Sequence, residues 1–577
     1  MRIEGRGTAP AGPPVTIRFD GTPVSAFEGE AVMAALVAAG RMAQRRTRSG
    51  APRGVFCGMG VCQDCLVTVD GVPNRRACMT PVVDGLRVET QGELAATAPP
   101  DAPLVDAPRE VATPDLLIVG GGPAGMTAAL AAAARGLVVT LVDERPALGG
   151  QYFKQLSKAH RFEGDGARDA QFDEGGTLVG RVEAAGVRIL RDAEVWGAFP
   201  PDEVAVAAGG RTLLFRPRRI LLATGSYERA VPFPGWTLPG VMTTGAAQTL
   251  LRAYRVAPGR RVLVGGNGPL NLQVAVELLK AGAAVVALAE AAAAPGPAVA
   301  GALAAAAAAS PGLMLRGARD LGTVRTHGVP AFHRHMVVEA RGDGRVEEAT
   351  IARIDAAGRV DPASRRTFAV DAVCLGAGFH PSNELARALG AEHVWDAARR
   401  QLVAVRDADG RTTAPGVFLV GDAAGLGGAR VAAEEATIAA HAAADDLGRP
   451  RTPDAEGAAA SARRRLARHR RFQAALWTIY AAPDPGLSLA DDDTLVCRCE
   501  EVTVGTLLAA AGGGDVGAAK RASRCGMGRC QGRYCGPLLA DATARAGGDP
   551  LAETGFFAPR APVKPVPLRV AARVEEA

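Results

Sequence analysis

Aromatic residues are scarce in this chain of 577 residues, at 4%, and only eight residues are histidine. The charge balance is also unremarkable, since 66 Lys and Arg against 60 Asp and Glu leave a net charge of +6. A charge this small and this dispersed argues against nucleic-acid binding. The histidines are scattered and form no general-base or nucleophile pattern, so the sequence identifies no catalytic residue.

The chain also lacks a strongly apolar run. Its N-terminal stretch MRIEGRGTAPAGPP is polar and rich in Pro and Gly, unlike a signal peptide. The longest apolar run, 291–310, is nearly all Ala and contains Pro295 and Pro297, which makes it a poor membrane span. We therefore expect a cytoplasmic chain with no transmembrane segment, in which this run is an Ala-rich helix pair broken at the two prolines.

Cysteine is almost absent from the middle of the chain, where Cys374 stands alone in an apolar run. The other nine cysteines fall in two groups, at 57–78 and 497–535. Grouped thiols of this kind indicate a reducing compartment and metal binding rather than a disulfide framework. Because the flavin-like part described below contains only Cys374, it lacks the dithiol that disulfide reductases require.

The first cysteine group predicts an iron–sulfur site. Cys57, Cys62, Cys65 and Cys78 follow the pattern C-x4-C-x2-C with a fourth cysteine after a hydrophobic strand, which is the plant-type [2Fe–2S] pattern. Zinc, the alternative metal, favours paired C-x2-C knuckles, and two disulfides are the other alternative. Short strands and one helical run across 15–90 favour a β-grasp ferredoxin-like domain over residues 1–90, followed by a Pro/Ala/Asp-rich linker at 91–113.

A large α/β flavoprotein domain is expected over 114–450. It opens with an apolar strand that runs into Gly120, Gly122 and Gly125, a G-x-G-x-x-G fingerprint at the start of a helix. These glycines allow a tight turn and the close approach of a pyrophosphate to the helix N-terminus. Asp143, followed by Glu144, lies where a ribose-binding acid is expected.

Further motifs support a flavin at this fingerprint. Together they resemble the two-dinucleotide-binding-domain flavoproteins, in which a Gly-Asp pair contacts the ribityl and pyrophosphate groups of FAD. The resemblance assigns FAD binding to a further set of residues: Gly150, Gln151, Thr224, Gly225, Gly421 and Asp422. The alternative is a Rossmann-like fold that binds no flavin.

A second nucleotide lobe is expected over 256–374. Gly266 and Gly268 match the first two glycines of a fingerprint, but Asn271 replaces the third, and a side chain there crowds helix against strand. Glu290 is the candidate ribose acid, which would favour NAD over NADP. Both an NAD(P) site and a purely structural lobe remain open.

The second cysteine group follows a helical connector at 451–490 and lies in a compact unit at 491–545, before a tail at 546–577. This unit resembles the bacterioferritin-associated-ferredoxin type of helical [2Fe–2S] domain. The resemblance assigns four ligands, Cys497, Cys499, Cys530 and Cys535, and leaves Cys525 as a spare or alternate ligand. Zinc is the alternative metal, and the lack of accompanying histidines argues against a Rieske centre.

The order of these parts resembles the domain order of the α-type subunits of heteromeric amine and imino-acid dehydrogenases. These include hydrogen cyanide synthase, opine oxidase, D-hydroxyproline dehydrogenase and the α subunit of sarcosine oxidase. The resemblance implies FAD, two [2Fe–2S] clusters and a partner flavoprotein of the D-amino-acid-oxidase type. The partner would hold the small amino or imino acid and pass electrons through this chain to an unidentified acceptor. The alternatives are a self-contained NAD(P)H-dependent reductase and a non-catalytic redox sensor or scaffold.

Overall fold

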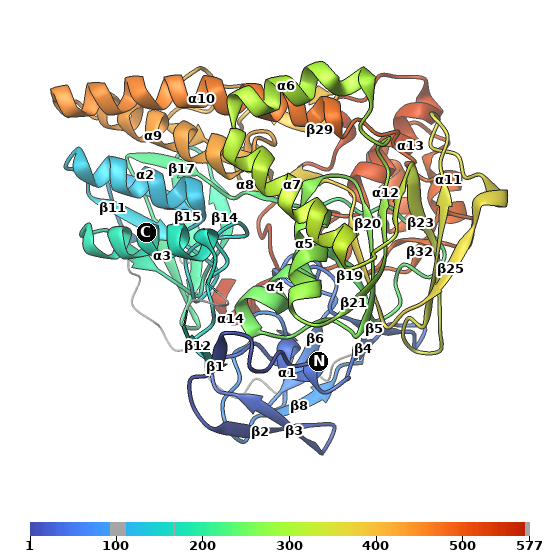
Figure 1. Cartoon of the computed structure of the whole chain (residues 1–577). Coiled ribbons are helices and arrows are strands. Elements are labelled where there is room, and N and C mark those ends of the chain that lie inside the picture. The colour runs from blue at the N-terminus through green and yellow to red at the C-terminus, as the bar shows by residue number, and fades with distance from the viewer. Residues whose placement is uncertain (93–110, 165–167, 572–577) are drawn as a thin grey trace.

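The computed structural model describes residues 1–92, 111–164 and 168–571. Most of the linker predicted at 91–113, and the last six residues of the tail predicted at 546–577, lie outside the described residues. Figure 1 shows the N-terminal strands in blue below a large α/β part. The C-terminal helices, in red, lie against one side of that part. This arrangement matches the predicted multidomain α/β and α+β fold class.

A five-stranded sheet in the order β3-β2-β8-β6-β7 forms the N-terminal part. Its strands are β2 (Pro14–Phe19), β3 (Thr22–Phe27), β6 (Leu66–Val69), β7 (Val72–Arg76) and β8 (Arg87–Thr90). Helix α1 (Val32–Ala38) buries six apolar side chains in the core that it shares with the sheet. The hairpin of β4 (Ala43–Arg46) and β5 (Pro52–Gly54) leads into the cysteine loop, so the loop is held between two strands.

A parallel sheet in the order β13-β11-β10-β17-β30 forms the first α/β unit. Its strands are β10 (Leu116–Val119), β11 (Val139–Val142), β13 (Arg188–Leu190), β17 (Arg219–Leu222) and β30 (Val417–Leu419). Every residue of β10 and β11 is buried, as expected for parallel strands covered on both faces. The helices are α2 (Pro123–Ala134), α3 (Ala170–Ala184) and α9 (Gly428–Asp446). A smaller sheet adjoins it: β9 (Val111–Ala112), β14 (Ala193–Phe199), β15 (Glu203–Ala208) and β16 (Arg211–Phe215).

The second α/β unit repeats this strand–helix–strand plan. Its parallel sheet has the order β19-β26-β20-β21-β22. The strands are β19 (Val241–Thr243), β20 (Arg261–Gly266), β21 (Ala284–Glu290), β22 (Ala331–His333) and β26 (Ala372–Gly376). Helices α4 (Thr244–Tyr254) and α5 (Pro269–Lys280) follow β19 and β20. An antiparallel layer adds β23 (His335–Arg341), β24 (Glu348–Arg353) and β25 (Arg366–Ala369).

Short elements complete the α/β part. Two antiparallel pairs join distant segments: β1 (Thr8–Pro10) with β12 (His160–Phe162), and β18 (Ser226–Glu228) with β27 (Phe379–Pro381). The consecutive strands β28 (His393–Asp396) and β29 (Gln401–Ala404) form an antiparallel hairpin. Helix α8 (Glu384–Ala388) follows β27. The pairing of β18 with β27 brings a strand that precedes the second unit against one that follows it, so the two units meet there.

The Ala-rich run breaks at a different place from the one expected. Helix α6 (Ala300–Ala309) is followed by α7 (Pro311–Thr326), and the bend between them falls at Ser310, not at Pro295–Pro297. Pro311 lacks an N–H group and disfavours helical backbone at the preceding residue, so it starts a new helix. No single helix of the described residues is long and apolar enough to cross a membrane. Among these residues, only the pair of helices that meets at this 119° bend has the length and composition of a membrane span.

The C-terminal part begins with the long helix α10 (Pro453–Ile479), in the region where we expect a helix. The Thr452 hydroxyl caps it by accepting from the Ala455 N–H at 3.2 Å, and Pro453 occupies the first turn. The cysteine-rich unit then follows: β31 (Leu495–Cys497), β32 (Val502–Thr503), α11 (Val504–Ala511), α12 (Val516–Ser523) and α13 (Gly536–Gly547). A last short helix, α14 (Leu568–Ala571), packs near β16.

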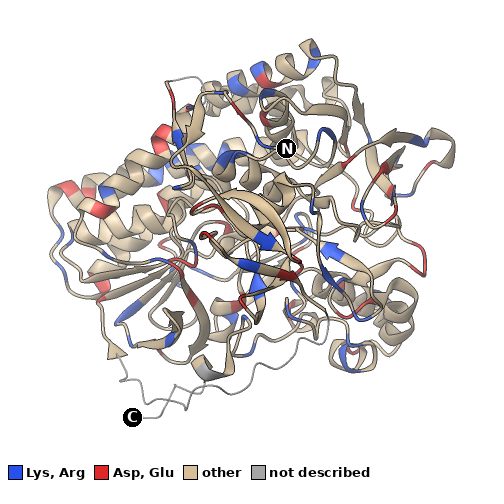
Figure 2. Cartoon of the chain, turned by 90° about the horizontal axis from the view of Figure 1, so that it is seen from below, with Lys and Arg blue, Asp and Glu red and all other residues tan. Residues whose placement is uncertain are grey.

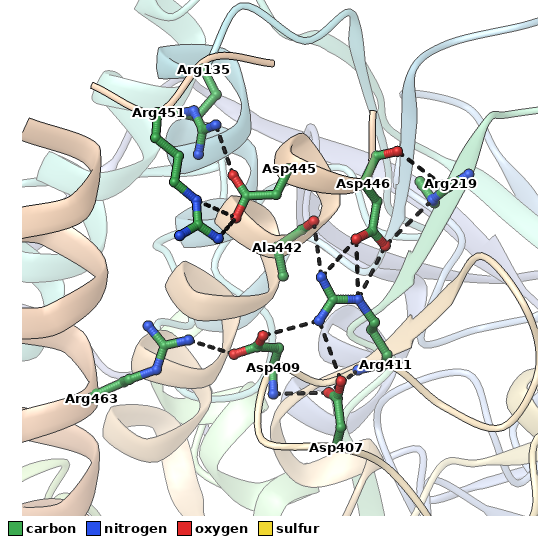
Figure 3. Close-up of polar contacts among 10 residues, drawn as sticks. All are labelled: Arg135, Arg219, Asp407, Asp409, Arg411, Ala442, Asp445, Asp446, Arg451 and Arg463. Atoms are coloured by element: carbon green, nitrogen blue, oxygen red, sulfur yellow. Dashed lines mark hydrogen bonds and ion pairs between the residues drawn. The ribbon is translucent and has the colours of Figure 1, made fainter. Parts of the chain in front are cut away.

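Charged side chains link α10 to the first unit, which includes α9 and the loop that contains Arg411. Arg411 lies at the centre of the network in Figure 3 and contacts the carboxylates of Asp407, Asp409 and Asp446. Arg463 of α10 reaches the same Asp409 at 2.5 Å, so two helices and a loop share one group of charges. Elsewhere on the molecule, Lys and Arg alternate with Asp and Glu, as Figure 2 shows, in keeping with the small net charge.

Two glycine-to-alanine substitutions test the packing of the first fingerprint helix. A Cβ at Gly125 in α2 would lie 1.7 Å from the Gly120 carbonyl oxygen, whereas a Cβ at Gly180 in α3 would meet nothing within 4 Å. We expect Gly125→Ala to lower the free energy of unfolding by about 1 to 3 kcal/mol. Gly180→Ala should raise it by about 1 kcal/mol, because only helix propensity changes. Urea denaturation measures both, and equal stability of the two variants would contradict the packing described.

Candidate redox sites

A cavity of 1690 Å³ lies between the two α/β units. The glycine loops after β10 and β20 both line it, as do the end of α10 and the segment that follows it. Met59 and Val61, from the N-terminal cysteine loop, also reach its wall. A cavity of this size exceeds the usual range for drug-sized ligands and has room for a dinucleotide.

The fingerprint loop of the first unit has no space for side chains. Gly120 has φ +107°, and a Cβ there would lie 2.4 Å from the Ala223 carbonyl oxygen. A Cβ on Gly150 would meet the Gly122 Cα at 2.8 Å, so the two glycine turns pack directly against each other. Gly120 and Gly150 are therefore positions that only glycine permits, and with Gly122 they form a cradle of the kind that a pyrophosphate site requires.

The two acids predicted near this cradle have different partners. Asp143 accepts hydrogen bonds from the backbone N–H groups of Gly121 at 2.5 Å and Arg145 at 2.8 Å. Burial raises the pKa of Asp143 to about 6. Glu144 forms an ion pair with Lys564 of the tail, and both acids line the cavity. Asp143 thus holds the glycine loop, while Glu144 joins it to the C-terminal part.

Gln151, Thr224 and Gly225 also line the cavity, whereas the predicted Gly125 lies in α2, packed against Gly120, and is not part of the lining. Gln151 accepts from the Lys154 ammonium through its backbone oxygen at 2.8 Å, and the Thr224 hydroxyl donates to the Ser382 backbone oxygen at 2.6 Å. Gly225 has φ +71°, which a turn at this strand end requires. The second turn of the cradle and the loop after β17 therefore face the same space.

The Gly-Asp pair lies at the start of α9. Asp422 accepts hydrogen bonds from the N–H groups of Gly427 at 2.9 Å and Gly428 at 2.8 Å, and burial raises its pKa. The Gly421 N–H donates to Glu435 at 3.0 Å. This arrangement positions the N-terminus of α9 on the cavity wall, where a helix dipole favours an anionic group.

The second glycine loop differs from a complete fingerprint, as its sequence indicates. Asn271 is buried; its amide donates to the Gly376 backbone oxygen at 2.9 Å, and its oxygen accepts from the Thr244 hydroxyl at 2.9 Å. The side chain therefore ties the helix to the strand instead of leaving the gap that a third glycine provides. Glu290 accepts from the Gly268 N–H at 3.1 Å, and burial raises its pKa to about 7.

Two buried ionisable residues of the cavity were not predicted from the sequence. Lys154 donates to Gln248 at 2.9 Å, and burial lowers its pKa to about 7. Glu228 accepts from the Gly245 N–H at 2.8 Å, and burial raises its pKa to about 7. Glu228 lies in the same stretch as the predicted Thr224 and Gly225, but its role, like that of Lys154, is identified only by the convergence of the two side chains on the cavity. Both side chains can hold or release a proton near neutral pH.

The N-terminal cysteine site comprises Cys57, Cys62, Cys65 and Cys78, all of them buried. The thiols interact in pairs, Cys57 with Cys62 and Cys65 with Cys78. Backbone N–H groups of Met59 and Cys62 point at the Cys57 sulfur from 3.5 and 3.4 Å. Although burial acts to raise it, hydrogen bonds from Cys62 and the backbone lower the pKa of Cys57 to about 6. Two thiol pairs surrounded by N–H donors suit a [2Fe–2S] cluster.

The C-terminal cysteine site brings five thiols together: Cys497, Cys499, Cys525, Cys530 and Cys535. The sulfurs of Cys497, Cys525 and Cys535 all lie within 4.8 Å of one another, and Cys499 pairs with Cys530. Cys525 is therefore inside the group and not apart from it. Gly528 lets Cys499 approach, because a Cβ there would lie 2.3 Å from the Cys499 Cβ.

An ion pair joins the two cysteine sites across 434 residues of sequence. Arg498, between Cys497 and Cys499, donates to Asp64 beside Cys65 at 2.5 Å, and Arg45 pairs with the same carboxylate at 2.9 Å. The Arg498 guanidinium lies over the rings of Phe56 and Trp236, at 4.0 and 4.7 Å from their centroids. Burial opposes ionisation of Asp64, but the arginines hold its pKa below the usual range.

The charges around this pair fit anionic groups at the cysteine sites. Three arginines, Arg45, Arg53 and Arg498, are buried around Asp64. Among the described residues, the Arg53 Nε and Nη2 atoms have no hydrogen-bond partner, and burial lowers the pKa of Arg53 to about 10. A cluster held by four thiolates carries net negative charge and would offset this excess of buried positive charge.

Comparison with known proteins identifies the family. Residues 12–93 match a 2Fe-2S iron-sulfur cluster binding domain, residues 114–444 match pyridine nucleotide-disulphide oxidoreductase, and residues 493–574 match the sarcosine oxidase A3 domain. The A subunit of opine oxidase from Agrobacterium tumefaciens is 33% identical over 79% of this chain and 90% of its own length. The chain belongs to the opine oxidase A-subunit family. The predicted family is therefore confirmed.

Other relatives agree with this placement. Hydrogen cyanide synthase subunit HcnB of Pseudomonas aeruginosa is 34% identical over 78% of this chain and 97% of its own length. The crystal structure of L-proline dehydrogenase from P. horikoshii has the same fold, with a TM-score of 0.71, 22% identity and 98% coverage of both chains. As a member of the opine oxidase A-subunit family, the chain is an FAD-dependent oxidoreductase with an N-terminal [2Fe–2S] domain.

Neutralising Asp64 tests the electrostatics of the contact between the cysteine sites. Asp64→Asn leaves three buried arginines without their shared carboxylate, so we expect the free energy of unfolding to fall by about 3 to 5 kcal/mol. The control Asp173→Asn removes the exposed partner of Arg168 and should cost less than about 1 kcal/mol. Urea denaturation compares the two variants. Equal losses would mean that Asp64 does not neutralise the buried arginines.

Proposed function

We propose that this chain is the electron-transferring subunit of a heteromeric dehydrogenase or oxidase that acts on C–N bonds of small amino or imino acids. In this role it relays electrons from a partner flavoprotein to an acceptor. The names of its relatives support the proposal, since the opine oxidase and hydrogen cyanide synthase chains are each one subunit of an enzyme.

The observation that carries the proposal is the meeting of three sites. Met59 and Val61 of the N-terminal cysteine site line the flavin cavity, and so does Arg533, beside the C-terminal cysteine site. Cys57, Cys62 and Cys530 belong to one cluster of packed, buried side chains. Protein sites that meet in this way allow electrons to pass between cofactors without a domain movement.

The proposed FAD site consists of the predicted residues that line the cavity, with the cradle at Gly120, Gly122 and Gly150 as its centre. FAD supplies exchange between two-electron and one-electron chemistry. Lys154 and Glu228 hold protons at the cavity wall, with pKa values of about 7 for both. Burial of these two groups keeps competing water away from them.

At the C-terminal site we propose the ligand set Cys497, Cys499, Cys530 and Cys535, with Cys525 as an alternate ligand. The pairing of Cys499 with Cys530 supports one half of this set, and the closeness of Cys497 to Cys535 supports the other. Zinc is the competing metal.

Metal analysis tests both cysteine sites together. With two [2Fe–2S] clusters, iron and acid-labile sulfide should each be about four per chain. Cys499→Ser should lower both to about two, while the control Cys374→Ser should leave them unchanged, because Cys374, which is buried in β26, belongs to neither cysteine group of the sequence. A wild-type value of about two iron atoms, with zinc present, would assign zinc to the C-terminal site.

Flavin reduction tests the partner. We propose that the partner is a flavoprotein of the D-amino-acid-oxidase type that holds the substrate. Co-expression with such a chain should give a stable complex in which an amino or imino acid bleaches the flavin of this chain, whereas the isolated chain should not respond. Full-rate oxidation of amino acids by the isolated chain would refute the proposal.

The second nucleotide loop supports one alternative function, that of an NAD(P)H-dependent reductase. Gly266 and Gly268 have positive φ values, and Glu290 lies at the cavity as a ribose acid would. The filled third position at Asn271 argues against it. Anaerobic addition of NADH to the isolated chain decides between the two, since rapid flavin bleaching would establish the reductase.

A further inference from the structure

Tyr534 lies where the three sites meet. It belongs to the C-terminal cysteine loop, directly before Cys535, yet its ring contacts residues of both other sites. Its centroid is 5.3 Å from that of Phe56, which precedes Cys57, and 5.8 Å from that of Tyr227 on the cavity wall. Both contacts have tilted or edge-on geometry, typical of packed aromatic pairs. One side chain of the C-terminal site thus reaches the N-terminal site and the flavin cavity.

The hydroxyl group of Tyr534 is buried and has no hydrogen-bond partner among the described residues. Buried tyrosine hydroxyls normally have a partner, because an unsatisfied one costs free energy. The ionisable groups that act on it electrostatically are the thiols of Cys57, Cys62 and Cys530 and the carboxylate of Glu228, with Cys57 the strongest. The unpartnered hydroxyl belongs to a residue that shares one packed cluster of buried side chains with Cys57, Cys62 and Cys530.

The Cys57 sulfur already accepts hydrogen bonds from the protein. Two backbone N–H groups point at it, and Tyr534, Cys57 and Cys62 share one packed cluster of buried side chains. Hydrogen bonds to the sulfurs of an iron–sulfur cluster stabilise the reduced, more negative state and raise its reduction potential. A hydroxyl donor from another domain would have the same effect.

We propose that Tyr534 donates its O–H hydrogen bond to a sulfur of the N-terminal [2Fe–2S] cluster, so that the C-terminal cysteine loop completes the surroundings of that cluster and sets its potential. The inference rests on the ligand set Cys57, Cys62, Cys65 and Cys78. It does not require a cluster at the C-terminal site. Tyr534 acts here as a tuning residue that accepts no electrons and transfers no proton.

The substitution Tyr534→Phe tests this proposal in the full-length, cluster-loaded chain, because it removes the hydroxyl and keeps the ring contacts. We expect the equilibrium constant for reduction of the N-terminal cluster to fall about tenfold, which is about 59 mV for a one-electron couple. A redox titration followed by electron paramagnetic resonance measures the potential. The reduced wild-type cluster should also show coupling to an exchangeable proton that is lost in D2O and in the variant.

Two comparisons make the result specific. Cys65→Ser removes the N-terminal cluster and so identifies its signal. Tyr227→Phe removes the hydroxyl of the neighbouring ring, on which Glu384 acts most strongly, and should leave the N-terminal potential unchanged.

An unchanged N-terminal potential in Tyr534→Phe, or a shift confined to the C-terminal signal, would overturn the proposal. A wild-type chain that shows no N-terminal signal would refute the ligand set itself, and the iron content identifies that outcome separately.

Discussion

The ion pair between Arg498 and Asp64 is the contact on which the arrangement of the redox sites depends. It joins two cysteine loops that are separated by most of the chain, and both partners are buried. A buried pair of this kind gives little net stability, because desolvation offsets the attraction between the charges. Its effect is instead to select one way of docking the N-terminal domain, since any other would leave several buried arginines without a counter-charge.

The docking of the two loops also explains the composition of the cavity wall. With Arg498 over the rings of Phe56 and Trp236, Met59 and Val61 of one cysteine site and Arg533 of the other all line the cavity. The cavity is therefore bounded by both cysteine sites as well as by two nucleotide-binding units. This arrangement supports the proposed role of the chain as an electron-transferring subunit.

Local motifs were predictable because their chemistry depends on neighbouring residues. The cysteine spacing, the glycines of the first loop and the long helix α10 all follow from short-range constraints on backbone and ligand geometry. The bend between α6 and α7 was misplaced, because Pro311 starts a helix while Pro295 lies before one. Lys154 and Glu228 were missed because neither residue type is diagnostic at its position in the sequence, and each becomes notable only when it is buried at the cavity.

Residue type and spacing were enough to establish which groups this protein can use: two sets of thiols, a glycine cradle and an acid at each nucleotide loop. Local backbone geometry translates such patterns directly into sites, so they are visible along the chain. Folding was needed to bring the sets together and to pack Tyr534 of one site against Phe56 of another. Such proximity depends on long-range packing and on the balance of buried charge, and neither leaves a pattern in the order of the residues.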